Sequence, residues 1–90
     1  MKPTDKHKKS AVFFDALAHP RRQMILQVLE EVKAGGLPFH RLQARTGLSA
    51  ATLSFHLGKM NAGGILQRQI KGPETWLSLN YTALSRLHAS

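Results

Sequence analysis

Five histidines, at positions 7, 19, 40, 56 and 88, are the side chains best suited to bind a metal or to move a proton near neutral pH. Metal-binding histidines commonly stand four residues apart on one helix face. No two of these histidines have that spacing, and the chain contains no cysteine that could supply a thiolate. The sequence also lacks paired carboxylates, a nucleophile with its base, and a glycine-rich phosphate loop. We therefore expect neither an enzyme nor a bound metal or other cofactor.

The balance of charged side chains points to a polyanionic partner. Thirteen Lys and Arg stand against five Asp and Glu in 90 residues, which gives a net charge of +8. Nucleic-acid binders and binders of anionic membranes both show such an excess. The basic residues are spread over the chain rather than beside one apolar face, and no segment approaches the roughly 18 apolar residues of a membrane span. We expect a nucleic-acid partner, no membrane association and a cytoplasmic location.

The stretch LSAATLSFHLGKMNAGGIL, residues 48–66, has the pattern of a helix whose outward face lacks charge. Ser49 is expected to be the N-cap of this helix, and Gly63 with Gly64 is expected to end it. A recognition helix needs small or polar side chains at its N-terminal end, so that its backbone approaches base edges in the major groove of DNA. We expect DNA contacts from Ser49, Ala50, Ala51, Thr52, Ser54, Phe55 and His56.

Two of these residues have a second interpretation. His56 stands at the edge of the inward apolar stripe, so its ring either reaches a phosphate or packs inside the domain. An alanine-rich helix face that carries Phe55 is also compatible with a contact to another protein. Both alternatives stay open at the level of the sequence.

The rest of the pattern places helices before this stretch and a β-hairpin after it. Apolar spacing predicts a helix from residue 10 to the His19-Pro20 pair, a second that Gly35 and Gly36 end, and a short third over residues 38–45. After Gly64 the period changes to two: ILQRQI and TWLSLN form the strands of a hairpin that KGPE closes, and a short helix follows.

This order of elements, α-α-α-α-β-β-α, predicts a mainly α fold with a small β-hairpin, the winged helix-turn-helix. Residues 10–90 would form the DNA-binding domain, and residues 1–9 a disordered basic tail. The hairpin would be the wing. Because a wing lies along the DNA backbone, we expect Arg68 and Lys71 to bind phosphates.

Three stretches of the chain resemble the arsenic-repressor (ArsR) family of bacterial transcriptional regulators. They are FDALAHPRRQMILQVL, LSAATLSFHLGKMNAGGIL and RQIKGPETWLSLN. The blocks LAHPRR, residues 17–22, and SFHLGKM, residues 54–60, match the family patterns L-x-x-P-x-R and S-x-H-L-x-x-L. The resemblance implies a homodimeric repressor that binds an imperfect palindrome in a promoter. It also implies dimerisation through the first and last helices, which here carry Val12, Phe13, Leu17, Leu84 and Leu87.

The chain departs from the family at its metal-sensing sites. Pro38 and His40 stand where metal-sensing members carry a Cys-x-Cys motif, and the last helix supplies only His88 as a ligand. The effector is therefore left open, and a small-molecule signal would have to bind at the dimer interface. The alternative function is a winged-helix module that acts through protein or RNA contacts.

Overall fold

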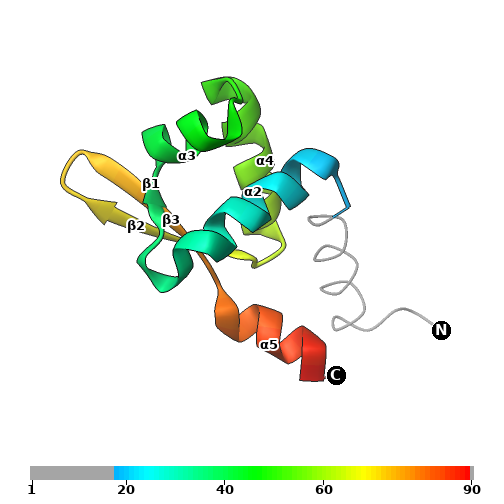
Figure 1. The fold of residues 1–90 in the computed structure, drawn as a ribbon. Coiled ribbons are helices and arrows are strands. Elements are labelled where there is room, and N and C mark those ends of the chain that lie inside the picture. The colour runs from blue at the N-terminus through cyan, green and yellow to red at the C-terminus, as the bar shows by residue number, and fades with distance from the viewer. Residues whose placement is uncertain (1–17, 90) are drawn as a thin grey trace.

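The structure, a computed structural model, describes residues 18–89, with side chains up to Ser85. Its elements are α2 (Pro20–Val32), the 3-10 turn η1 (Lys33–Gly35), β1 (Leu37–Pro38), α3 (Phe39–Thr46), α4 (Ala50–Ala62), β2 (Leu66–Lys71), β3 (Glu74–Leu79) and α5 (Tyr81–Ala89). From α2 onward this order agrees with the predicted one, apart from η1 and β1, which were not predicted (Figure 1). The predicted tail 1–9, the helix with Val12, Phe13 and Leu17, and the side chain of Leu87 lie outside the described part. No described helix is long and apolar enough to cross a membrane.

The second predicted helix, α2, begins where the sequence indicated and ends earlier. His19 is its N-cap, with Nδ1 accepting a hydrogen bond from the Arg21 backbone N–H at 3.1 Å, and Pro20 occupies the first turn. The predicted stop at Gly35 and Gly36 is wrong by a few residues. The helix ends at Val32 because the following residue takes a positive φ of 60°, and η1 intervenes before the glycines.

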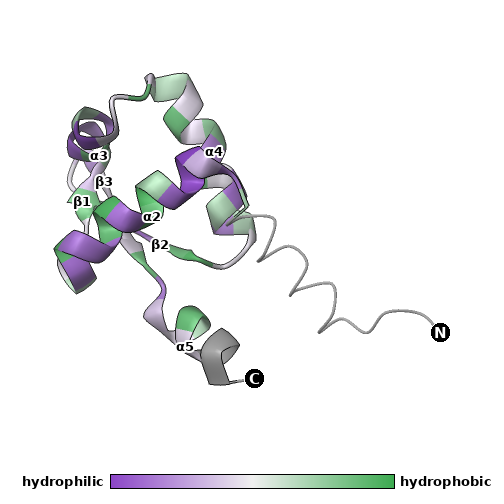
Figure 2. Cartoon of the chain, turned by 45° about the vertical axis from the view of Figure 1, so that its right-hand side comes forward, coloured by the Kyte–Doolittle hydropathy of each residue, from purple (hydrophilic) through white to green (hydrophobic). Residues whose placement is uncertain are grey.

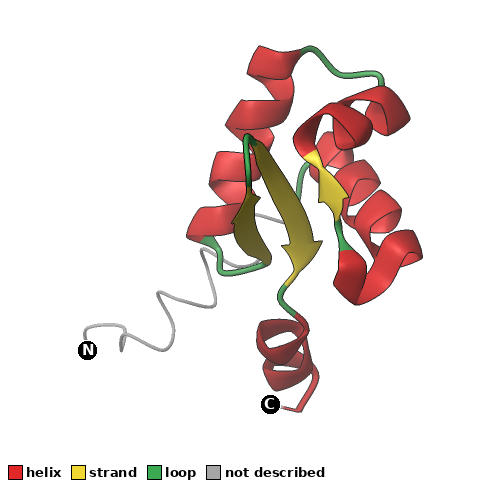
Figure 3. Cartoon of the chain, turned by 90° about the vertical axis from the view of Figure 1, so that its left-hand side faces the viewer, coloured by secondary structure: helices red, strands yellow, loops and turns green. Residues whose placement is uncertain are grey.

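A short strand, β1, adds to the hairpin a partner that the sequence did not indicate. It pairs antiparallel with β3, with Leu37 opposite Leu77, so the sheet has the strand order β1-β3-β2 (Figure 3). Gly36 makes this approach possible. Its φ is +69°, and a Cβ built there would lie 2.4 Å from the carbonyl oxygen of Leu77. No side chain fits where the chain enters β1.

Helices α3 and α4 form the helix-turn-helix. Gly47, in the left-handed conformation, ends α3, and the Ser49 hydroxyl caps α4 by accepting a hydrogen bond from the Thr52 backbone N–H at 3.2 Å. Ser49 is thus confirmed as the cap. Gly63 follows α4 as its C-cap, as predicted.

One apolar core joins α2, α3, α4 and the sheet. Its buried members are Ile25, Val28, Leu29, Leu37, Leu42, Leu53, Leu57, Met60, Ile65, Leu66, Leu77 and Leu79. Arg22 is buried as well, at 8% exposure, because it lies one turn before Ile25 on the same face of α2, where an arginine stem packs against apolar neighbours.

Candidate nucleic-acid interface

The first turn of α4 presents a surface without bulky or charged side chains. Ala50 and Ala51 are exposed, and Figure 2 shows this turn in pale green, whereas α3 is largely hydrophilic. The hydroxyl groups beside them are partly engaged: Ser49 Oγ donates to Thr52 Oγ1 at 2.9 Å while it caps the helix. Ser49 therefore acts first as a cap, and within the described part of the chain the Thr52 hydroxyl accepts from Ser49 and donates to no other group. This turn can approach a partner closely.

Phe55 is the large apolar side chain of this face. It is 59% exposed, which is unusual for a phenylalanine in a small domain. The Lys59 ammonium lies 5.7 Å from the centre of its ring, one helical turn further on. Ser54, beside it, is also exposed. This pair of a ring and a cation suits a partner that offers apolar base edges next to phosphates.

His56 does not belong to this surface. Its side chain is 3% exposed, and its ring packs 4.6 Å from the ring of His19 and edge-on to Phe55. No residue of the described part is hydrogen-bonded to its Nδ1. Of the two interpretations that the sequence left open, burial contradicts the phosphate contact and favours internal packing, so we remove His56 from the candidate DNA contacts.

The burial of His56 predicts an acid-sensitive fold. Burial, and then the neighbouring His19, Arg22 and Arg21, lower the pKa of the His56 imidazole from its ordinary value of 6.5. Since the unfolded chain binds this proton more readily than the folded one, His56 costs no stability above pH 6.5 and destabilises the fold as the pH falls below it. Urea unfolding should give a lower free energy of unfolding at pH 5.5 than at pH 7.5. His56→Gln should reduce this dependence; an equal pH dependence in the variant would contradict the assignment.

The two predicted wing cations lie on opposite faces of the hairpin. Arg68 is paired with Leu77, so its side chain shares the face that turns toward α4. Lys71 lies on the other face, with its ammonium 4.3 Å from the centre of the Trp76 ring. The structure therefore brings Arg68, and not Lys71, next to the recognition helix.

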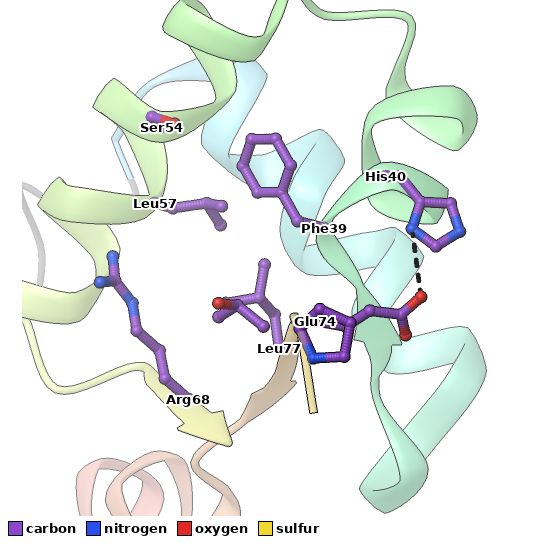
Figure 4. Close-up of a pocket in the computed structure, with 9 residues that line it drawn as sticks. Phe39, His40, Ser54, Leu57, Arg68, Glu74 and Leu77 are labelled. Atoms are coloured by element: carbon purple, nitrogen blue, oxygen red, sulfur yellow. Dashed lines mark ion pairs between the residues drawn. The ribbon is translucent and has the colours of Figure 1, made fainter. Parts of the chain in front are cut away.

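A cavity of about 510 Å³ separates the wing from α3 and α4. Ser54 lines it from α4 and Arg68 from β2, so two predicted DNA contacts meet at this cavity (Figure 4). At the opposite end of the cavity His40 Nδ1 is 3.9 Å from the Glu74 carboxylate. Phe39 lies between this pair and the end that Ser54 and Arg68 line. The cavity thus places a guanidinium at one end and a histidine–carboxylate pair at the other.

Sequence reasoning missed Lys59, His40 and Glu74 in this region. Lys59 could have been found, because it stands four residues after Phe55 on one helix face. The pairing of His40 with Glu74 could not have been found from the sequence, because it depends on β1, which brings the start of α3 beside β3. In the described part, no three His, Cys, Asp or Glu side chains gather as a metal site.

Comparison with protein-family models and with curated protein sequences gives no match. Solved structures are similar over nearly the whole chain. The homodimeric winged helix-turn-helix DNA-binding domain of Mb0332 from Mycobacterium bovis, a possible ArsR-family transcriptional regulator, has a TM-score of 0.79 at 24% identity, over 97% of this chain and 82% of that chain. The transcriptional repressor BigR from Xylella fastidiosa has a TM-score of 0.70 at 26% identity, over 99% and 92%. Rv0081 from M. tuberculosis has a TM-score of 0.75 at 28% identity, over 97% and 85%. The winged helix-turn-helix fold is thereby confirmed, and with it the resemblance in fold to ArsR-family regulators.

Proposed function

We propose that this chain, which has the fold of ArsR-family winged helix-turn-helix regulators, is a sequence-specific transcriptional regulator that binds double-stranded DNA as a homodimer. Helix α4 would lie in the major groove, and the wing would follow the backbone. Its role is regulatory rather than catalytic, and it would act in the cytoplasm. Because BigR is a transcriptional repressor, we propose repression as the outcome of binding.

The observation that carries this proposal is the bare first turn of α4 beside the exposed Phe55 and Arg68. In a chain with a net charge of +8, such a surface suits a polyanion whose bases must be approached closely. Ala50 and Ala51 would allow the approach, and Phe55 would contact a thymine methyl group. Ser54, Thr52, Arg68 and Lys71 would bind phosphates or base edges. Ser49, whose side chain caps the helix, would contact the DNA through its backbone at the start of α4.

The homodimer is supported by the Mb0332 domain, which is homodimeric. In this chain α5 projects away from the rest of the fold (Figure 1), and Leu84 on it packs against the core while its side chain stays partly exposed. We propose that Leu84, together with Leu87 and the predicted Val12, Phe13 and Leu17, forms the dimer interface. A dimer would place two copies of α4 on two half-sites of a palindrome.

Two substitutions should separate phosphate binding from sequence readout. Arg68→Ala should weaken binding to a selected and to a random duplex alike, and lower the slope of log K against log salt by about one. Phe55→Ala should weaken binding to the selected duplex by roughly tenfold and leave the random duplex nearly unaffected, since an apolar contact to a base carries specificity. Fluorescence anisotropy across salt concentrations measures both. Equal losses on the two duplexes for Phe55→Ala would argue against its readout role.

A further inference from the structure

The cavity between α4 and the wing borders the helix face that would enter the groove. Ser54 lines it from α4, Arg68 from β2, and Thr75 from β3. A helix in the major groove has a sugar–phosphate strand on each side, because those strands are the walls of the groove. With α4 placed as proposed above, the strand on the wing side passes over this cavity. The inference below rests on that proposed function.

Glu74 is an acidic residue in the lining of this cavity. The carboxylates of the described part belong to Glu30, Glu31 and Glu74, and of these only Glu74 lines the cavity. Its carboxylate accepts a hydrogen bond from Trp76 Nε1 at 3.1 Å and lies 3.9 Å from His40 Nδ1 (Figure 4). The hydrogen bond from Trp76 holds the carboxylate at the His40 end of the cavity, while 43% of the side chain stays exposed. Glu74 is also the register partner of Lys71, so the two side chains share one face of the hairpin.

A carboxylate fixed beside a phosphate strand repels it, and this repulsion is the same for every base sequence. Arg68, at the other end of the cavity, attracts the same strand. We propose that the sugar–phosphate strand next to α4 rests across this cavity and that Glu74 opposes it there. Glu74 thus lowers the affinity for all duplexes below that which the basic side chains alone would give, and favours release from non-specific DNA.

Glu74→Gln tests the proposal because glutamine keeps an oxygen acceptor for Trp76 and removes the charge. We expect the variant to bind both a random and a selected duplex roughly two to five times more tightly at low salt, with the gain shrinking as salt screens the charges. Glu30→Gln is the matched control. It changes the net charge by the same amount at an exposed position of α2 that does not line the cavity.

A second measurement locates the opposing phosphate. Duplexes that each carry one uncharged methylphosphonate linkage are titrated with the wild type and with Glu74→Gln. At the linkage that rests over the cavity, the affinity difference between the two proteins should disappear, because the carboxylate then has no phosphate charge to repel. At linkages elsewhere the difference should persist.

The outcomes separate this inference from the proposed function. Tighter binding by Glu74→Gln than by Glu30→Gln, with the difference lost at one or two neighbouring linkages, supports it. If the wild type binds duplex DNA and the two variants bind equally well, the function stands and the role of Glu74 is refuted. If the wild type binds no duplex, the proposed function fails and this inference fails with it.

Discussion

Replacement of Gly36 by alanine is expected to lower the melting temperature by about 10 °C or more. A Cβ at this residue would lie 2.4 Å from the carbonyl oxygen of Leu77, and the φ of +69° is unfavourable for an L side chain. The left-handed conformation alone costs about 1–2 kcal/mol, and the overlap with a backbone atom adds to it. Together these amount to roughly 2–3 kcal/mol, and in a domain of this size each kcal/mol shifts the midpoint by about 4–8 °C.

Gly35→Ala is the control for this prediction. It lies next in the chain, has no positive φ, and has open space where its Cβ would be. This variant should melt within about 2 °C of the wild type or slightly above it. Thermal unfolding followed by circular dichroism compares the two. Similar melting of both variants would show that β1 does not pack against β3 as closely as the structure has it.

Ala51→Glu is expected to reduce the affinity for a selected duplex by about 100-fold or more, without loss of folding. Ala51 is exposed in the first turn of α4, where an acidic side chain interacts favourably with the helix dipole. In the groove, however, the same carboxylate would meet the phosphates of both walls, and its length would keep the backbone away from the bases. Like charges forced together at an interface cost several kcal/mol, and each 1.4 kcal/mol is tenfold in affinity.

The control for Ala51→Glu is Ala34→Glu. It makes the same change of side chain and charge at an exposed residue of η1, outside the helix-turn-helix. We expect it to weaken binding only slightly, through the net charge. Anisotropy titrations at one salt concentration, with circular dichroism as the check on folding, suffice. A comparable loss in both variants would mean that α4 does not enter the groove.

Features set by neighbouring residues could be predicted from the sequence. The Ser49 cap, the Gly63 stop and the change of period at the hairpin all depend on local chemistry that a sequence displays directly. The apolar stripe of α4 was predicted for the same reason, because helical spacing alone decides which side chains share a face.

Features that depend on residues far apart in the chain could not be predicted from the sequence. Strand β1 has two residues, too few to show alternation, and its partner Leu77 lies far along the chain. His56 stands at the edge of a stripe, where spacing alone does not decide between burial and exposure, and its neighbour His19 comes from another element. The placement of Lys71 over Trp76 depends on the strand register, which the sequence does not specify.

The most direct test of the proposed function is a selection of bound duplexes from a random oligonucleotide pool, repeated at several salt concentrations. A homodimer that reads DNA with α4 should enrich a palindrome whose half-sites lie about one helical turn, roughly 34–36 Å, apart, with affinity that falls steeply as salt rises. Weak, charge-driven binding with no enriched sequence would contradict sequence-specific regulation. The exposed face of Ala50, Ala51 and Phe55 would then be a contact for a protein or RNA partner.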